Sequence, residues 1–456
     1  MKEFKKIVLI DMYKGSRDKL SSHLSPEAII GPHYPLGLVS IASYLKNKLP
    51  KLFIRILDER LLTSKQLEQE LYEIKPDIVG ISCIFKNYKD ALDLARLAKK
   101  VGAKVLVGGH YASALAREIL INRGPASVDY CVDGVIKQDG ERAFYQYVRG
   151  DSMKKIDNLV YLEKDKIIEN KISLLNLDKL PSLRVDLADP KIYFKKHQNK
   201  FPTSQYRKPF MIYSQKGCYW RSASSGGCVF CSIMYNKLRL KSPKIIWNEI
   251  EMLVSDYGVD YIWDISDNFL SDKEWFKEFY KEFFRRKIIK PFLKIQARAD
   301  NLIDEKIIKM LSEINVVQIF VGFESNDNQC LNNIKKGTGA PINEKAISIL
   351  AKYKISIMAY FVLGLPEETE QSLARTIKFA EKIFNIGNKN LLIIPRFVPL
   401  PGSAAFNFLV KKTGKKYVGA DIINWDEASN DWTKHFCNVS SEKITKAQDY
   451  LRKLQH

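Results

Sequence analysis

Three cysteines lie close together between Gly217 and Cys231, and their spacing suggests a metal centre. Cys218, Cys228 and Cys231 fall within fourteen residues, whereas the whole chain has 7 cysteines in 456 residues. Thiolates bind both zinc and iron–sulfur clusters. Cys228 and Cys231 alone would be half of a zinc site, but no His or Cys nearby in the sequence offers a fourth ligand. Three thiolates on a four-iron cluster leave one iron open to a small molecule, so the trio favours a cluster over zinc.

The cysteines follow the first of several strands expected in residues 210–405. Strand-like and helix-like runs alternate there, with candidate strands at 210–214, 261–265, 292–297, 317–323, 356–363 and 391–398. Six such units predict a partial (β/α)6 barrel, an open relative of the eight-stranded barrel. Active sites of such barrels lie at the carboxyl ends of the strands.

Polar residues at these strand ends could bind a charged ligand. Asp267 and Asn268 offer a carboxylate and an amide, which suit an ammonium ion. Arg298 offers a guanidinium that can clamp a carboxylate through two hydrogen bonds. Each residue also has a plain structural reading, since Glu324 could cap a helix and Gly364 could simply form a turn. It is their joint position behind the cysteines that indicates a site.

The cysteine loop resembles the Cys-x-x-x-Cys-x-x-Cys signature of the radical S-adenosylmethionine superfamily, including Phe230 before the last cysteine. The first gap is nine residues here instead of three. We expect the extra residues, roughly 221–226, to fold outward while Cys218 still binds iron. The resemblance implies a [4Fe-4S] cluster on the three cysteines, with S-adenosylmethionine beside it. The residues that it implies for S-adenosylmethionine binding are Phe230, Asp267, Asn268, Gln296, Arg298, Glu324, Ser325 and Gly364.

Residues 1–150 also alternate strand and helix. The candidate strands are 6–11, 52–58, 77–82, 104–109 and 128–133, and the candidate helices are 36–47, 64–74, 88–101 and 112–122. This α/β pattern predicts a doubly wound parallel sheet whose ligand binds beyond the carboxyl ends of the strands. Small residues at those ends, such as Gly108 and Gly109, let a bulky ligand approach the backbone closely. No Gly-x-Gly-x-x-Gly follows the first strand, which argues against a dinucleotide.

This first segment resembles the cobalamin-binding domain that precedes some radical S-adenosylmethionine enzymes. The resemblance rests on Tyr34-Pro-Leu-Gly-Leu38, Gly80-Ile-Ser82, Gly108-Gly-His110 and the Asp133-Gly134 to Glu141 stretch. It implies cobalamin contacts from Leu36, Gly37, Ser82, Gly108, Gly109, His110, Gly134 and Glu141. The Asp-x-His-x-x-Gly element that supplies a cobalt ligand in other cobalamin proteins is absent. We therefore expect cobalamin without a lower histidine ligand, and a structural or loop role for His110.

The remaining segments should connect and cap these two domains. We expect residues 151–209 to form a linker over the surface, with short strands at 158–163, 166–169 and 170–173. Residues 406–456 should form a helical cap that ends in a helix at 441–454. Trp432 and His435 either line a pocket or pack in the core, and the sequence leaves both roles open.

Composition narrows the classes of protein. The chain is 46% hydrophobic and 27% charged, which is typical of soluble globular proteins. The apolar runs are too short to span a membrane, and the N-terminus lacks the apolar core of a signal peptide, so we expect a cytoplasmic protein. The net charge of +21 is compatible with a nucleic-acid partner. Because the basic residues are dispersed, a solvated surface is the simpler interpretation.

Together the two resemblances imply a cobalamin-dependent radical S-adenosylmethionine enzyme. The activity that they favour is methyl transfer to an unactivated carbon of a small molecule or peptide. They also imply an electron donor such as ferredoxin or flavodoxin. The first alternative is a radical cyclase or oxidoreductase with the same cofactors. The alternative from another class is a zinc-containing nucleic-acid-binding protein, which the charge motivates.

Overall fold

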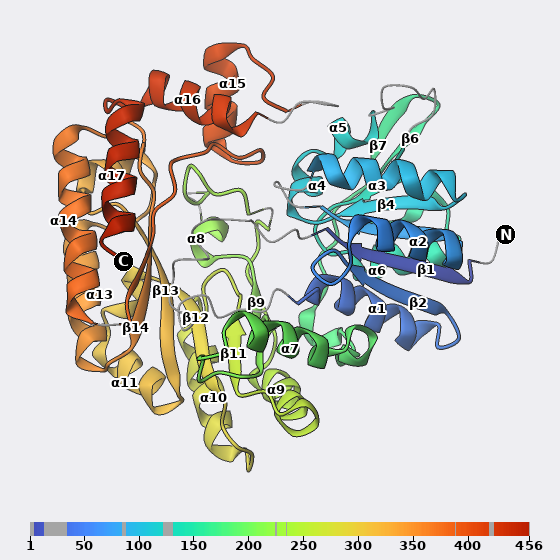
Figure 1. Cartoon of the computed structure of the whole chain (residues 1–456), viewed down its shortest axis with the longest axis horizontal. Coiled ribbons are helices and arrows are strands. Elements are labelled where there is room, and N and C mark those ends of the chain that lie inside the picture. The colour runs from blue at the N-terminus through green and yellow to red at the C-terminus, as the bar shows by residue number, and fades with distance from the viewer. Residues whose placement is uncertain are drawn as a thin grey trace. The chain divides into compact units, whose positions relative to one another are not determined.

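A computed structural model describes residues 4–12, 34–83, 88–121, 131–223, 226–233, 235–387, 389–418 and 424–455. They form two compact units, one built mainly from His33–Pro190 and the other from Lys191–Tyr417 and Asn424–His456. Figure 1 draws the two units with their helices and strands labelled. The change from one unit to the next falls at residue 190, which lies within the linker expected at 151–209.

Unit 1 contains a seven-stranded sheet in the order β2-β1-β3-β4-β5-β6-β7. The first five strands pair in parallel, and β6 and β7 are antiparallel. The strands are β1 (Lys6–Asp11), β2 (Phe53–Asp58), β3 (Ile78–Ser82), β4 (Lys104–Gly108), β5 (Gly134–Ile136), β6 (Leu159–Glu163) and β7 (Lys166–Glu169). The helices are α1 (Leu36–Lys48), α2 (Ser64–Ile74), α3 (Tyr88–Lys100), α4 (His110–Ala114), α5 (Ala116–Leu120) and α6 (Glu141–Val148).

The apolar runs of the sequence explain why unit 1 forms this sheet. β1 is buried from Ile7 to Ile10, as expected of a central parallel strand that is covered on both faces. Ile7 and Leu9 share one core cluster with Leu45 of α1 and Phe144 of α6. A doubly wound parallel sheet, as the sequence predicted, is the result.

The fifth strand differs from the prediction. It was expected at 128–133, but β5 begins at Gly134, and residues 131–133 are not in a strand. Asp133 explains the shift, because its carboxylate accepts a hydrogen bond from Val105 N–H (2.7 Å) and pairs with Lys99 and Lys104. The aspartate thus fixes the start of the strand. Residues 128–130 and 122 lie outside the described residues.

The expected linker is largely part of the unit 1 sheet. β6 pairs with β5 and β7 pairs with β6, so these two strands extend the sheet at one edge. The third short strand, expected at 170–173, is not formed. Asn158 instead holds that stretch, since its Oδ1 accepts a hydrogen bond from Ser173 N–H (2.6 Å). A 3-10 turn at Met153–Lys155 precedes β6, and two more, at Leu177–Lys179 and Val185–Ala188, follow β7.

Unit 2 contains six parallel strands that pair in the order of the sequence. They are β8 (Pro209–Ile212), β11 (Tyr261–Asp264), β12 (Phe292–Arg298), β13 (Val316–Glu324), β14 (Ser356–Phe361) and β15 (Leu391–Ile393). β8 and β15 stand at opposite ends of this order, so the sheet is open, as predicted for a (β/α)6 partial barrel. Two short strands, β9 (Gln215–Lys216) and β10 (Arg239–Leu240), form a separate antiparallel pair beside the cysteines.

Helices connect the successive strands of unit 2. They are α7 (Pro190–Lys200), α8 (Tyr219–Ser222), α9 (Pro243–Tyr257), α10 (Lys273–Arg285), α11 (Glu305–Glu313), α12 (Asn328–Asn333), α13 (Ala340–Lys352) and α14 (Glu370–Ile386), with a 3-10 turn at Ala299–Leu302. α13 and α14 run along the side of β13 and β14 (Figure 1). Because the six strands are parallel, their carboxyl ends lie at one edge of the sheet.

Three further helices close the chain: α15 (Ala404–Thr413), α16 (Trp425–Phe436) and α17 (Ser441–Lys453). α17 agrees with the helix expected at 441–454. Trp432 on α16 is 1% exposed and stacks between Phe397 and Phe436, at ring distances of 4.5 and 4.4 Å. Trp432 is therefore a core residue, whereas His435 on the same helix is exposed. Within the part of the chain that the structure describes, no helix is long and apolar enough to cross a membrane.

Candidate active site

The cysteine loop begins where β8 ends, and residues after β11 hold its entrance. Ser266 Oγ accepts hydrogen bonds from the N–H groups of Ser214 (3.0 Å) and Gln215 (2.9 Å). Asp267 Oδ2 accepts one from Gly217 N–H (2.9 Å). Gly217 has a φ of +91°, a conformation that favours glycine. The chain thus turns sharply into Cys218, and one carboxylate oxygen of Asp267 is already hydrogen-bonded to that turn.

The residues after Cys218 form a short helix, α8, which is docked on the neighbouring strand ends. Tyr219 OH donates to Asp300 Oδ2 (2.5 Å), and Trp220 Nε1 donates to Lys335 O (2.8 Å). These two aromatic residues anchor the first half of the loop, an arrangement that the sequence did not predict.

The extra residues of the loop follow this anchored helix. Ser222, Ala223 and Gly226 are exposed, which agrees with the expected outward fold. Arg221 Nη1 donates to Gly226 O (2.9 Å) and so joins the two ends of the insertion. Residues 224 and 225 lie outside the described residues.

The three thiols of the loop are free and half-buried. Cys218 interacts electrostatically with Cys228, and Cys228 with Cys231, so the fold brings the trio together. Burial raises the pKa of Cys231 to about 11 and also raises that of Cys228, where Lys336 and Arg298 oppose the rise. A metal that binds these thiols displaces their protons, and the two cations offset the resulting negative charge.

The donor set suits a cluster. Among the described residues, no three His, Cys, Asp or Glu side chains converge as ligands of a single ion do. A [4Fe-4S] cluster needs a different arrangement of ligands, since each thiolate binds its own iron. Three half-buried thiols on one loop, near the cations Lys336 and Arg298 and a glycine turn, fit that arrangement.

The segment Ile334–Gly337, just after α12, holds several parts of the site together. Its carbonyl oxygens accept hydrogen bonds from Val229 N–H (2.9 Å), Trp220 Nε1 (2.8 Å) and Arg298 Nη2 (2.6 Å). A Cβ on Gly337 would lie 2.3 Å from the Trp220 ring, so a side chain there would displace the indole. Sequence reasoning missed this segment, because glycine after a helix is an ordinary signal for a helix end.

Arg298 is committed to the cysteine loop. Its Nε lies 3.2 Å from Tyr219 OH and 3.0 Å from Asp300 Oδ1, and its guanidinium lies 5.2 Å from the centre of the Trp220 ring. With Nη2 on Lys336 O, the side chain joins β12 to α8 and to the segment after α12. A role as carboxylate clamp stays a prediction, and the contacts seen here give Arg298 a positioning role as well.

Asn268 follows β11, and Gln296 lies near the end of the neighbouring strand β12. Asn268 is fully buried, and its Oδ1 lies 3.4 Å from Arg298 N. Its Nδ2 has no hydrogen-bond partner among the described residues, so the amide can donate to a bound group. Gln296 is half-buried, as is Phe230 in the cysteine loop. These positions agree with a ligand at this edge, and the individual contacts stay predictions.

Glu324 ends β13 in a strained conformation. It has a φ of +63°, which is unusual for a residue other than glycine and is often found at functional sites. Lys336 Nζ donates to its Oε1 (2.8 Å), and both side chains are buried. Its Oε2 has no hydrogen-bond partner among the described residues. A Cβ on Gly322 would lie 2.5 Å from Oε1, so this glycine makes room for the ion pair.

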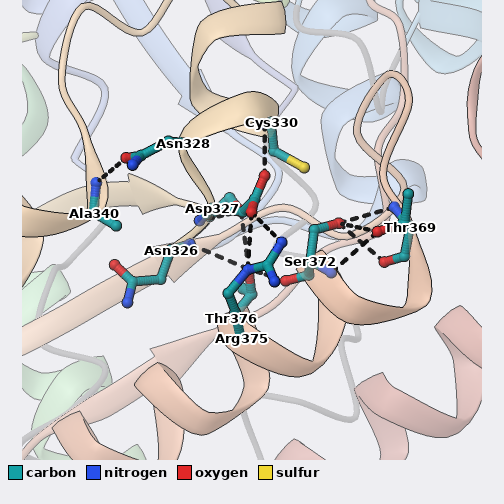
Figure 2. A network of polar contacts seen from close by, with 10 residues as sticks. Asn326, Asp327, Asn328, Cys330, Ala340, Thr369, Ser372, Arg375 and Thr376 are labelled. Atoms are coloured by element: carbon teal, nitrogen blue, oxygen red, sulfur yellow. Dashed lines mark hydrogen bonds and ion pairs between the residues drawn. The ribbon is translucent and has the colours of Figure 1, made fainter.

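Ser325 points away from this edge. Its Oγ lies 2.9 Å from Thr376 Oγ1 and accepts a hydrogen bond from Asp327 N–H (3.2 Å). Asp327 also binds Arg375 and caps α12 at Cys330, in the network of Figure 2. Ser325 is fully buried in these contacts, which give it a structural role. Contact with S-adenosylmethionine stays a prediction with no geometric support.

Gly364, after β14, is enclosed by protein. Its N–H donates to Glu368 Oε2 (2.7 Å), and its carbonyl oxygen accepts a hydrogen bond from Trp432 Nε1 (3.1 Å). Its φ of +88° requires glycine. Burial raises the pKa of Glu368 to about 7. Glu368 and Trp432 therefore fix this turn, and the sequence identified neither as its partner.

In unit 1, Gly108 at the end of β4 and Gly37 at the start of α1 leave room for a ligand. Among the described residues, a Cβ on Gly37 would have no atom within 4 Å, and one on Gly108 would meet only Ile136 O, at 3.7 Å. Gly109 differs, since its φ is +107° and a Cβ would lie 2.6 Å from Cys83 O. Ser82 pairs with Gly108 at the same edge, and His110 is exposed at the start of α4. This open edge fits the approach of a large group such as cobalamin.

Three other predicted cobalamin contacts have structural explanations. Gly134 starts β5, and a Cβ there would lie 2.8 Å from Leu159 Cδ1, so core packing requires glycine. Glu141 is buried and accepts a hydrogen bond from Ser40 Oγ (2.7 Å), which ties α6 to α1. Leu36 is buried at the start of α1. Their contact with cobalamin stays a prediction.

Comparison with known proteins gives two family matches and several relatives. Residues 28–146 match the B12 binding domain, and residues 212–380 match the Radical SAM superfamily. An uncharacterized methyltransferase of Pyrococcus horikoshii is 27% identical over 436 residues, which cover 90% of this chain and 85% of that protein. An anaerobic magnesium-protoporphyrin IX monomethyl ester cyclase of Cereibacter sphaeroides is 24% identical over 333 residues, which cover 70% of this chain and 51% of that protein.

A solved structure supports the same architecture. The cobalamin-dependent S-adenosylmethionine radical enzyme OxsB has a TM-score of 0.71 at 15% identity, and the match covers 98% of this chain and 66% of that one. At this identity the likeness shows the fold alone. The order of the two matched domains agrees with this architecture. The fold agrees with it as well, and so does the position of the cysteine loop at the carboxyl edge of an open sheet. The chain therefore belongs to the cobalamin-dependent radical S-adenosylmethionine enzymes, and its domains imply cobalamin, S-adenosylmethionine and a [4Fe-4S] cluster as cofactors.

Proposed function

We propose that the protein methylates an unactivated carbon of a small molecule. The observation that carries the proposal is the combination of the cysteine loop, at the strand edge of unit 2, with a glycine-lined edge in unit 1. The similarity to a named methyltransferase along 90% of the chain supports the choice of methyl transfer within the family. When bound, the cofactors supply a 5′-deoxyadenosyl radical and a transferable methyl group.

The residues of this chain would bind and position those groups. Cys218, Cys228 and Cys231 would hold the cluster, and α8 would fix the loop through Tyr219 and Trp220. Because Arg298 and Lys336 lie near Cys228, their charges would stabilise the electron that the cluster accepts.

Polar groups with spare hydrogen bonds would bind S-adenosylmethionine. Asn268 Nδ2 and Glu324 Oε2 are buried at the same edge, and neither atom has a hydrogen-bond partner in the described part of the chain. Such atoms are costly in a folded protein unless a ligand completes them. An amide donor suits a carboxylate, and a carboxylate oxygen suits an ammonium or a hydroxyl group.

We also propose the cellular setting. An enzyme that starts by reducing a cluster requires a one-electron donor, such as ferredoxin or flavodoxin. The free cysteines fit a reducing compartment, so the cytoplasm is the proposed location.

The test is anaerobic reconstitution followed by two measurements. The proposal expects about four irons per chain and reductive cleavage of S-adenosylmethionine to 5′-deoxyadenosine. With S-adenosylmethionine that carries a deuterated methyl group, products formed from a cell extract should gain that methyl. Cys437→Ala serves as the control for substitutions in the loop, because Cys437 lies outside the trio.

Two other results would point elsewhere. Cleavage of S-adenosylmethionine with a ring-closed or oxidised product, and without methyl gain, would favour the cyclase alternative that one relative represents. A colourless protein that retains zinc and binds RNA in a salt-sensitive manner would contradict the enzyme proposal altogether.

A further inference from the structure

Lys294 is buried in β12, and the described residues place no opposing charge beside it. The residue is 1% exposed, and the hydrogen bond found for its Nζ is a weak one to Met358 Sδ at 3.6 Å. Burial lowers the pKa of Lys294 to about 7, and no charged group of the described chain contributes to that shift. Proteins rarely bury a lysine unless a counter-charge accompanies it. The missing partner requires an explanation.

Lys294 belongs to a row of polar residues that crosses four strands. It pairs in register with Trp263 on β11 and with Gln318 on β13, and Gln318 pairs with Ser356 on β14. Residues paired across parallel strands point to the same face of the sheet. The distance of 4.3 Å between Lys294 Nζ and the centre of the Trp263 ring agrees with this arrangement.

Two other members of this polar row have unsatisfied atoms. Trp263 Nε1 and Gln318 Oε1 are buried, and neither has a hydrogen-bond partner among the described residues. Ser356 cannot complete the row, because its hydroxyl donates to Lys389 O (2.6 Å) and accepts from Gln318 Nε2 (3.5 Å). Each unsatisfied buried group costs about 1–3 kcal/mol, so the row is destabilising as it stands. A bound group that completes these atoms would offset the cost.

The polar row shares a face of the sheet with the candidate active site. Side chains alternate along a strand, so Lys294, Gln296 and Arg298 of β12 point to the same side. Gln296 and its neighbour Phe320 on β13 are half-buried, and they lie one step closer to the carboxyl edge than Lys294. The polar row therefore lies on the same face as that edge, two residues along β12 from Gln296.

We propose that the polar row of Trp263, Lys294 and Gln318 binds an anionic group of the substrate, a carboxylate or a phosphate. This inference rests on the proposed function and specifies its substrate class. The anion supplies the counter-charge that Lys294 lacks and accepts a hydrogen bond from Trp263 Nε1. A lysine ammonium has three donors, so Lys294 can bind the anion and also reach Gln318 Oε1.

The test uses the cofactor-loaded protein labelled with 5-fluorotryptophan. The chain has 6 tryptophans, and Trp263→Phe identifies the fluorine resonance of Trp263. Inorganic phosphate and acetate are the probes, titrated separately at neutral pH. The Trp263 resonance should shift in a saturable way with at least one probe. The shift should be absent in Lys294→Met and unchanged in Lys306→Met, a control at an exposed lysine.

Several outcomes would overturn the inference. No saturable shift in the wild type, or the same shift in Lys294→Met, would show that the row binds no anion. If S-adenosylmethionine alone causes the shift and blocks the probes, the row binds the cofactor and not the substrate. Should Lys294→Met fail to fold, Gln318→Met replaces it, and an unchanged affinity for the probe in that variant counts against the proposal.

The proposed function is judged by a separate signal. Slow formation of 5′-deoxyadenosine without substrate is measured in the wild type and should persist in Lys306→Met, the exposed-lysine control. A wild-type protein that cleaves S-adenosylmethionine but binds neither probe would refute the anion subsite alone. A wild-type protein without cleavage would refute the proposed function, whatever the probes show.

Discussion

The two parallel sheets present opposite kinds of carboxyl edge. In unit 1 the ends of β3 and β4 carry small residues, and among the described residues the Cβ positions of Gly37 and Gly108 are open, whereas Arg60 pairs with Asp11 and Asp58 at the ends of β1 and β2. In unit 2 the edge is filled with charged side chains that bind one another, such as Arg298 with Asp300 and Glu324 with Lys336.

The difference follows from what each edge is suited to bind. An open backbone edge lets a large, rigid ligand lie flat, and it has few side chains that would reject a ligand because of its chemical groups. A filled edge holds a few donors and acceptors at fixed positions, as a small polar ligand requires. The first edge should therefore be sensitive to added volume, and the second to the loss of a single charge or thiol.

The largest expected effect is at the cysteine loop of unit 2. Cys218→Ala should abolish the binding of the intact cluster and all cleavage of S-adenosylmethionine, because two thiolates cannot replace three. Iron content and the electron paramagnetic resonance of the reduced protein measure this directly. Cys437→Ala should keep both signals. Full activity in Cys218→Ala would mean that another residue supplies the first ligand.

Removal of one charge from the filled edge should have a smaller effect, seen as a loss of stability. Lys336→Met leaves the Glu324 carboxylate buried without its partner, and breaking a buried ion pair costs about 3–5 kcal/mol. Urea denaturation of the two variants Lys336→Met and Lys336→Arg measures the difference. Arginine keeps the charge, so its loss of stability should be clearly smaller. Equal losses would show that packing, and not charge, holds Glu324.

The open edge of unit 1 offers a matched pair of glycines. Gly109→Ala forces a side chain onto a φ of +107° and places its Cβ 2.6 Å from Cys83 O, which should cost about 1–3 kcal/mol or more. Gly108→Ala meets no described atom closer than 3.7 Å and should fold normally. We expect Gly108→Ala to weaken cobalamin binding, measured by the absorbance of the bound corrinoid. If Gly108→Ala binds cobalamin like the wild type, the ligand does not approach this glycine.

The sequence predicted the sheets better than the contacts at their edges. Continuous apolar runs such as Ile7–Ile10 identify buried strands, because burial on both faces leaves no other pattern. The fifth strand was misplaced, since a side-chain contact from Asp133 to Val105 determines its start. Such a contact joins residues that are distant in sequence and carries no local signal.

Prediction from the sequence was limited in the same way for single residues of the candidate site. Polar residues after strands were found because a residue that directly follows a strand in the sequence lies at the carboxyl edge of the sheet. Their directions were not predictable, and Ser325 turns toward α14 while its neighbour Glu324 faces Lys336. Lys336 and Trp432 were missed as partners because each reaches the site from a helix or loop far along the chain.

The smallest expected effect concerns Lys294 and the dependence of stability on pH. Its pKa is near 7 in the folded chain and close to its ordinary value of about 10.4 in the unfolded chain. Between these values the unfolded state binds more protons, so Lys294 makes stability rise with pH, by at most about 1.4 kcal/mol per pH unit.

Thermal unfolding of wild type and Lys294→Met between pH 6 and 9 isolates this contribution. The wild type should gain stability relative to the variant as the pH rises, and the variant should be at least as stable as the wild type at pH 6. A saturating anion should remove the difference in slope, because it stabilises the charged lysine in the folded state. Parallel stability curves without an anion would mean that Lys294 is already charged and paired in the folded protein, and the polar row would then need no ligand.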